Sequence, residues 1–501
     1  MTRLTTSVRP VAPTRLGPSR GALISVAAVL ATVTNAVSFM FPPLLPLMQA
    51  QFELDVSASA WIFTAATLGG GAGFVLLPRL ADVLNDRTTS LLSGAVLTVG
   101  ALTPAIGNSY ATLLIGAALL GFGSSAQLLP LGFLRRHLPG DAVSTAVSVL
   151  IMATGSGTVA GMIGGGLTVK FLSLQSFFFI LTATAVATTV ALVVVIPSSK
   201  PVSTGKIGIP GTAWMLAWLT LILLALTQGL LWGGVAIVLL LAGVVGGVAW
   251  VRVERRSTSA VFDVKVLQKP FVKPACFAAA MFGCVDAGFL LLVSYYTQTP
   301  TSAGYGLGVD ALGTGLLLLP FALMMFVGGK AAERAVAKGR KSAVLIVGAA
   351  VCSVGLAWLG FAHQQWWHYL VGAALVGAGS RVGYSGSFAA PQMVVPEHKA
   401  GMAAGMVGTT MAIGIAFGAA LVSGLLTAAT IPGTSVPEEY LYAVGYAITS
   451  AFSLMVVLVA TLARLRQRRS RPATSTRITP HPPAHGRSRR PLAMAGRGQR
   501  V

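Results

Sequence analysis

Two ionisable residues, Asp286 and Arg381, stand near the middle of long apolar stretches of this 501-residue chain. A charge in such a stretch is costly unless it faces an interior cavity or a partner. A buried carboxyl group can carry a proton, because burial favours its neutral form while a nearby cation favours its charged form. We therefore interpret the two residues as candidates for proton coupling or substrate contact. Each is expected to be the other's partner, and a static pair that locks two helices is the alternative to a coupling role.

Two amides, Asn35 and Gln127, also interrupt apolar runs. Each can hydrogen-bond either a substrate or a neighbouring helix, and the sequence leaves both interpretations open. The aromatic and methionine run at 39–41 can line an adaptable apolar pocket or face lipid. The cysteines have no metal-type spacing, so we expect small core residues, no metal site and no cofactor. They are Cys276, Cys284 and Cys352.

Stretches of about 20 apolar residues, the length that spans a bilayer, recur along the whole chain. The chain is 54% hydrophobic and only 10% charged. This composition is typical of membrane-spanning helices and predicts an all-α polytopic membrane protein with about fourteen spans. Their expected centres lie near Ala31, Ala66, Leu97, Leu119, Ala153, Ala185, Ile222, Leu241, Asp286, Leu318, Cys352, Ser380, Ile413 and Val456.

The formal net charge of +22 is better explained by membrane topology than by nucleic-acid binding. If both termini are cytoplasmic, nearly all of the 35 Lys and Arg residues fall in inner segments. Lys170 falls in an outer loop and Arg381 within a span. This asymmetry follows the positive-inside rule. We therefore expect a multi-pass plasma-membrane protein with both termini in the cytoplasm, in contact with the lipid bilayer and with no nucleic-acid partner.

A stripe of glycines is predicted in the fifth span. Gly157, Gly161 and Gly165 are spaced four apart, and Gly166 follows them. On a helix this spacing leaves a strip without side chains, along which another helix can approach closely. The stripe indicates either ordinary helix packing or a surface on which two halves of the protein rock against each other.

A repeated order of features divides the chain into two related halves. GFGS at 121–124 and GAGS at 377–380 each precede a proline, Pro139 or Pro396, and then a glycine-rich helix. Parallel halves around a midplane site are a transporter architecture. We expect a cytoplasmic segment at 1–20, an N-terminal six-helix half at 21–197, a linker with two extra helices at 198–256, a C-terminal six-helix half at 257–463 and a disordered basic cytoplasmic tail at 464–501.

The chain resembles the major facilitator superfamily over about residues 21–465, and within it the fourteen-helix drug:proton antiporter-2 family. The superfamily's antiporter motif, Gly-x-x-x-Gly-Pro-x-x-Gly-Gly, is similar to residues 157–166, with Met162 in place of the proline. Asp82 and Arg87 resemble part of its inner-loop motif. Val37 and Ala117 stand where this family usually has an Asp and an Arg that are tied to proton coupling.

The resemblance implies the major facilitator fold and a secondary active transporter. Such a protein exports small hydrophobic drug-like or antibiotic compounds by alternating access, with protons as the coupling ion and the proton gradient as energy source. An uptake carrier or uniporter is the alternative, because the acid in the first span is missing. No clustered His, metal spacing or nucleophile with a base supports an enzyme, and we expect a monomer.

The resemblance also implies an inner gate. In it, Asp82 approaches the partially positive N-terminus of a helix near Gly401. Arg87, Arg135 and Arg136 would add ion pairs that form and break as the inner mouth closes and opens. A solvated loop acid is the alternative for Asp82.

Overall fold

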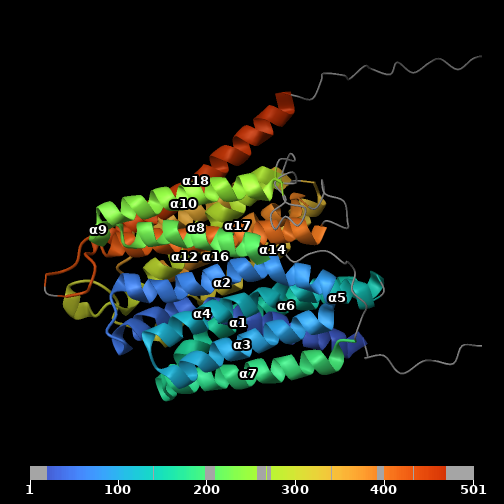
Figure 1. The fold of residues 1–501 in the computed structure, drawn as a ribbon. Coiled ribbons are helices and arrows are strands. Elements are labelled where there is room, and N and C mark those ends of the chain that lie inside the picture. The colour runs from blue at the N-terminus through green and yellow to red at the C-terminus, as the bar shows by residue number, and fades with distance from the viewer. Residues whose placement is uncertain are drawn as a thin grey trace, which may run out of the picture.

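The structure, a computed structural model, describes residues 20–138, 140–197, 209–256, 267, 272–339, 341–391, 400–432 and 434–469. These residues form mostly helices, which run side by side along one direction (Figure 1). Thirteen helical stretches in this described part are long and apolar enough to cross a membrane. With α16 (Trp366–Ala389), which packs among them, they confirm the predicted all-α polytopic fold and its spans.

The span α16 is less apolar than its neighbours because it carries Ser380, Arg381, Ser385 and Ser387. It packs extensively against α14 and α15 and also contacts α12. Ser380 and Ser387 are buried. Ser380 and Ser387 are covered by protein, while Arg381 and Ser385 are only partly buried, so this polar span keeps its polar residues toward the protein interior.

The helices gather into two lobes. The N-lobe, α1 to α7, lies at the bottom of Figure 1 in blue and green, and the C-lobe, α12 to α18, lies above it in yellow to red. The residue boundaries assigned to the two halves from the sequence stay a prediction. The N-lobe consists of α1 (Arg20–Gln51), α2 (Val56–Val83), α3 (Asp86–Gly107), α4 (Tyr110–Ser124), α5 (Leu129–His137), α6 (Gly140–Phe171) and α7 (Leu174–Val195).

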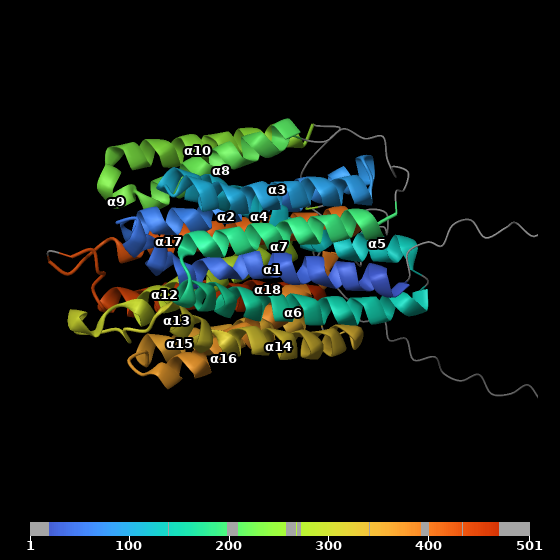
Figure 2. The ribbon, with the colours of Figure 1, turned by 90° about the horizontal axis from the view of Figure 1, so that it is seen from below.

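The extra pair, α8 and α10, lies at the edge of the bundle in Figure 2 and is joined by the short α9. α8 contacts both α2 and α17, so the pair touches both lobes. The pair and the linking turn are α8 (Ile209–Thr227), α9 (Gly229–Trp232) and α10 (Gly234–Glu254). The C-lobe consists of α12 (Val272–Gln298), α13 (Ala311–Leu317), α14 (Leu319–Ala337), α15 (Lys341–Phe361), α16, α17 (Ala400–Leu426) and α18 (Tyr440–Arg469).

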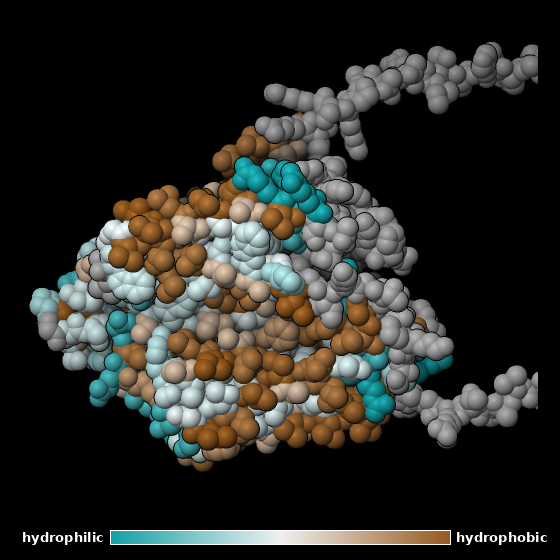
Figure 3. Space-filling view, viewed as in Figure 1, coloured by the Kyte–Doolittle hydropathy of each residue, from teal (hydrophilic) through white to brown (hydrophobic). Residues whose placement is uncertain are grey.

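The outer surface of the bundle is apolar along the middle of the helices. Figure 3 shows hydrophobic residues there and hydrophilic residues gathered toward the helix ends. Large apolar side chains such as Val194 and Val245 are exposed on this surface. We call the end where α1 begins and α18 finishes the termini end, and the opposite end the far end (Figure 1).

The predicted glycine stripe lies on α6 and packs closely against α1. A Cβ at Gly157 would come 2.3 Å from the carbonyl oxygen of Thr32, and a Cβ at Gly161 would come 2.3 Å from that of Ala36. Gly165, also on α6, faces the Leu44 side chain of α1. The close approach is confirmed, and it holds α1 to α6 inside the N-lobe.

The lobes pack together along α2 and α17, and α6 also meets the C-lobe at Gly166. A Cβ there would come 2.6 Å from the backbone nitrogen of Leu312 in α13, and a Cβ at Gly315 of α13 would come 2.2 Å from the Met162 carbonyl oxygen. Residues four apart share one helix face, whereas the residue after Gly165 lies about 100° around the helix. Gly166 and Gly315 therefore bring α6 and α13 into close contact between the lobes, and a rocking surface stays a prediction.

Replacing Gly161 with leucine should abolish transport and destabilise the fold by about 1–3 kcal/mol, because the side chain would meet the backbone of α1. Gly164→Leu is the matched control, since a Cβ at Gly164 meets no atom within 4 Å. Thermal unfolding in detergent and flux in vesicles measure both effects. Equal stability and flux in the two variants would show that close contact with α1 is not required.

Candidate functional site

A cavity of about 410 Å³ lies between the two lobes. Its volume falls within the range of about 300–1,000 Å³ that is usual for small-molecule sites. The four residues assigned from the sequence to the proton or substrate pathway all line it: Asn35, Gln127, Asp286 and Arg381. Apolar side chains from both lobes form much of the remaining wall: Phe39, Phe41, Phe63, Phe74, Leu290, Met325, Phe388, Met411 and Ile415.

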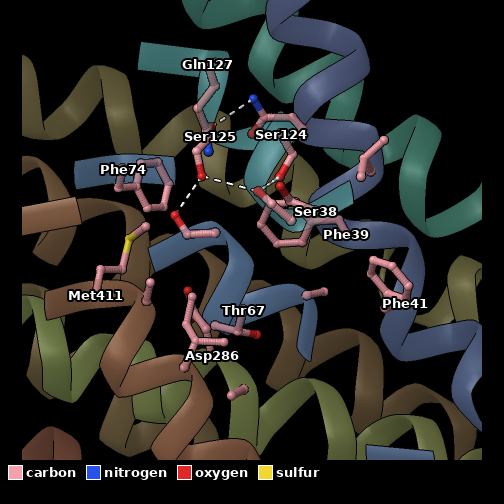
Figure 4. Close-up of a pocket in the computed structure, with 18 of the residues that line it drawn as sticks. Ser38, Phe39, Phe41, Thr67, Phe74, Ser124, Ser125, Gln127, Asp286 and Met411 are labelled. Carbon is pink, nitrogen blue, oxygen red and sulfur yellow. Dashed lines mark hydrogen bonds between the residues drawn. The ribbon is translucent and has the colours of Figure 1, made fainter. Parts of the chain in front are cut away.

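The N-lobe wall of the cavity is polar but uncharged. Asn35 Nδ2 donates a hydrogen bond to Gln127 Oε1 at 3.2 Å and another to the Ala31 carbonyl at 2.9 Å. Gln127 lies in the 3-10 turn that links α4 to α5, and Ser125 in the same turn donates to the Gly70 carbonyl at 2.7 Å (Figure 4). The two amides therefore bind each other between helices while they border the cavity.

The carboxyl group of Asp286 is held inside the C-lobe wall. Asp286 is 6% exposed, and its Oδ1 accepts a hydrogen bond from Ser380 Oγ at 2.5 Å. Ser380 in turn lies 3.5 Å from the sulfur of Cys352. Asp286 thus has a neutral hydroxyl donor as its partner, which lets the carboxyl group exist with or without its proton.

Arg381 is not the partner of Asp286. Within the described residues no ion pair joins them, and the Arg381 side chain lies over Gly329 of α14, where a Cβ would come 3.3 Å from its Nε. Glu333, one turn further along α14, is the carboxylate whose charge acts on it most. Successive residues of a helix point about 100° apart. When Ser380 faces α12, Arg381 therefore faces α14, and the expected pairing is wrong.

Buried polar contacts join the lobes at the far end. The Tyr295 hydroxyl of α12 lies 2.5 Å from Ser59 Oγ of α2. Gln298 Nε2 donates to the Pro43 carbonyl of α1 at 2.9 Å. The cavity wall extends the other way, to Gln127 and to Phe388 in the last turn of α16. The lobes are therefore closed at the far end, and the cavity extends toward the termini end.

An exposed ion pair supplements this closure. Lys170 Nζ lies 3.1 Å from Asp310 Oδ2, and half of each side chain is exposed. The backbone N–H of Gly313 and the Lys170 ammonium hold the pKa of Asp310 below its ordinary value. The pair therefore persists until the pH falls through that lowered pKa. An exposed pair stabilises by at most about 1 kcal/mol, so the buried contacts dominate the closure.

The gate predicted at the termini end is described only in part. Arg87 lies half-buried in the first turn of α3. The side chains of Asp82, Arg135 and Arg136 lie outside the described residues, so the gate stays a prediction. The repeat prolines Pro139 and Pro396 lie outside them as well.

Several cavity residues were missed from the sequence although their spacing carried a signal. Tyr384 and Phe388 follow Arg381 by three and seven residues, so all three share one helix face. Phe63, Thr67, Gly70 and Phe74 repeat at the same helical intervals along α2. The three cysteines are buried and unpaired, as the sequence indicated.

The family model of the Major Facilitator Superfamily matches residues 27–419 and 275–495, and the chain belongs to this family. A solved structure of the POT family transporter PepTSo has the same overall fold, with a TM-score of 0.59 and 16% identity over 90% of this chain and 99% of that one.

Curated relatives cover most of the chain. They include the cephamycin export protein CmcT of Amycolatopsis lactamdurans, 28% identical over 78% of this chain and 81% of the relative. The multidrug efflux pump LfrA of Mycolicibacterium smegmatis is 26% identical over 83% of each chain. The tetracenomycin C resistance and export protein of Streptomyces glaucescens is 24% identical over 79% and 73%.

Replacing Tyr295 with phenylalanine should open the far end more often, because it removes the buried contact with Ser59. Loss of one such hydrogen bond changes the two-state population roughly two- to tenfold. Pulsed spin-label distances between Gln51→Cys and Ser302→Cys, both exposed at the far end, measure the opening. Tyr440→Phe, an exposed tyrosine, is the control. An unchanged distance distribution in Tyr295→Phe would contradict this role.

Proposed function

We propose that this protein exports small hydrophobic drug-like or antibiotic compounds through the central cavity, by proton antiport with alternating access. The observation that carries the proposal is the cavity itself, an aromatic-rich space between two lobes with one protein-held carboxyl group in its wall. Adaptable apolar walls suit varied hydrophobic ligands. The export and multidrug relatives support this substrate class and direction.

Asp286 is the group that takes and releases the coupling proton. Val37, which stands where related drug antiporters carry an acid, lines the same cavity from the opposite lobe. Asp286 in the C-lobe wall therefore takes the place of the acid that the N-lobe wall lacks. Antiport requires that protonation of Asp286 and binding of the hydrophobic substrate disfavour each other. The cavity then holds the proton and the substrate in turn.

The cycle follows from the closed far end. In this conformation substrate enters from the termini end and settles among the aromatic side chains, with Arg381, Asn35 and Gln127 as its polar contacts. Rocking about Gly166 and Gly315 breaks the Ser59–Tyr295 contact and opens the far end, where substrate leaves. Asp286 is protonated there and returns its proton on the other side.

The setting of this cycle is the plasma membrane, with both termini in the cytoplasm and a monomer as the working unit. The proton gradient supplies the energy without a bound cofactor. Asp82, Arg87, Arg135 and Arg136 form the gate at the termini end.

Replacing Asp286 with asparagine should abolish transport driven by a pH gradient, because asparagine cannot bind or release the proton. The expected loss in inside-out vesicles is at least about tenfold, with substrate exchange in the absence of a gradient retained. Glu53→Gln, an exposed acid at the far end, is the control. Gradient-driven export by Asp286→Asn at the normal rate would refute the coupling role. Accumulation in the direction of uptake would favour the alternative carrier.

Replacing Asp82 with asparagine should slow turnover a few-fold while leaving substrate affinity unchanged, because a gate contact forms only during the conformational change. Initial rates of flux against substrate concentration separate the two quantities. An unchanged maximal rate would return Asp82 to the alternative of a solvated loop acid.

A further inference from the structure

The C-lobe concentrates buried polar atoms that have no hydrogen-bond partner. An unpartnered buried polar group costs about 1–3 kcal/mol, and ordered water normally satisfies such groups in proteins. Gathered in one lobe, these groups are suited to hold a chain of internal water. Among the described residues they belong to Ser294, Ser353 and His363, while Tyr384 interacts with Asp286, Tyr369 with Tyr446 and Tyr442 with Tyr305.

This set of groups begins at the far end with Glu439 and His363. His363 Nε2 lies 3.8 Å from Glu439 Oε1, and the Glu439 side chain is 43% exposed while His363 is buried. His363 Nδ1 lies 2.9 Å from the Leu359 carbonyl, which can only accept a hydrogen bond. Nδ1 therefore carries the proton, and Nε2 is free to receive another. The imidazole can pass a proton between the exposed carboxylate and the interior.

Tyrosines from the surrounding helices enclose His363. The ring of Tyr296 in α12 lies 5.0 Å from the imidazole, and that of Tyr446 in α18 lies 6.2 Å from it. The Tyr296 hydroxyl donates to Glu439 at 3.4 Å. Glu439 is the charged group that faces His363.

The tyrosine cluster extends from Tyr296 to Tyr369 at 5.9 Å, to Tyr442 at 5.1 Å and to Tyr305 at 5.5 Å between ring centroids. The charges of Glu438 and Glu439 act on Tyr305. Acidic residues therefore border the cluster on its far-end side, where they attract protons.

A second polar set lies deeper and reaches the cavity. Ser450 Oγ donates to the Ser353 carbonyl at 3.4 Å, and the Ser353 hydroxyl itself has no partner. The neighbouring Cys352 sulfur lies 3.5 Å from Ser380 Oγ, which donates to Asp286 at 2.5 Å. Cys352, Ser380 and Asp286 therefore form a series that ends in the cavity wall, and Ser353 and Ser450 lie next to its start.

We propose that these residues form a hydrated proton path inside the C-lobe, from Glu439 and His363 at the far end to Asp286. Ser450 follows Tyr446 by one helical turn on α18, which joins the two polar sets. The inference rests on the proposed function, in which Asp286 binds the proton that drives export.

Each relay group in the path gives up one proton as it receives another. A proton from far-end water or Glu439 adds to His363 Nε2 and then leaves from the same nitrogen to water held by the tyrosine and serine hydroxyls, because Nδ1–H stays bonded to the Leu359 carbonyl. The last transfer, through Ser380, converts the Asp286 carboxylate to its neutral form. No relay group is consumed.

Cys352 is the slow step of this path. A thiol is a weak donor, and the Cys352 sulfur has two acceptors at the same 3.5 Å, Ser380 Oγ and the Val376 carbonyl. Its position between Ser353 and Ser380 therefore limits proton transfer while the far end is closed. This restriction prevents protons from crossing to the cavity when no substrate moves.

The test needs no substrate. Full-length protein in liposomes is placed under a potassium diffusion potential, and proton flux is followed with an internal pH dye. Cys352→Ser supplies a better relay and should raise proton flux at least about fivefold over the wild type, whereas Cys352→Ala should not. Adding His363→Gln or Tyr446→Phe to Cys352→Ser should remove the excess flux. Ser90→Ala, which removes an unpartnered buried hydroxyl of the N-lobe, should leave it unchanged.

The proposed path would be wrong if the proton flux of Cys352→Ser equalled that of the wild type. It would also be wrong if the excess proton flux remained in both double variants. A second measurement uses variants that keep the native thiol. His363→Gln and Tyr446→Phe should slow gradient-driven transport about tenfold while exchange without a gradient stays within about twofold, and unchanged rates would also overturn the path. If the proposed function itself is wrong, the result differs, because gradient-driven export then persists in Asp286→Asn.

Discussion

The cost of placing an ionisable group inside an apolar bundle constrains the whole structure. Asp286 and Arg381 occur on helices that must stay buried, and each is accommodated in its own way. Asp286 receives a hydrogen bond from Ser380 within the C-lobe. Arg381 crosses Gly329 toward Glu333 and borders the cavity. Both groups are kept away from lipid because they line the central space between the lobes.

Close helix contact makes that space possible. The α6 glycines allow α1 and α6 to touch backbone to backbone, which packs the two helices tightly inside the N-lobe. Between the lobes, backbone contact is made through Gly166 and Gly315. The contacts at Ser59 and Gln298, by contrast, hold the far end closed.

The sequence predicted the spans and the depth of the polar residues well, because apolar length and charge are properties of a segment. Asn35 and Gln127 interrupt two different apolar runs of the sequence, and in the structure they bind each other at the cavity. The sequence did not predict the direction in which the side chains of α16 point. The orientation of Arg381 depends on how α16 is rotated and on the space above Gly329, and neither can be read from α16 alone. Ser380 was unrecognised as the partner of Asp286 for the same reason.

The same distinction applies to the glycine motif. Its spacing predicted close approach correctly, but any of several neighbouring helices could supply the partner. Only the tertiary arrangement assigns three glycines to α1 and Gly166 to α13. The buried tyrosines and His363 were not singled out, because a buried aromatic residue looks like ordinary core until the polar groups around it are seen.

Proton-driven export through this cavity requires that Asp286 change its protonation state within the working pH range. Infrared difference spectra of the purified protein, titrated between about pH 5 and 9, report the neutral carboxyl group through its C=O stretch. We expect a carboxyl band that disappears as the pH rises, is absent from Asp286→Asn and is intact in Glu53→Gln. A titrating band of equal size in Asp286→Asn, or no titrating carboxyl band in the wild type, would contradict the account.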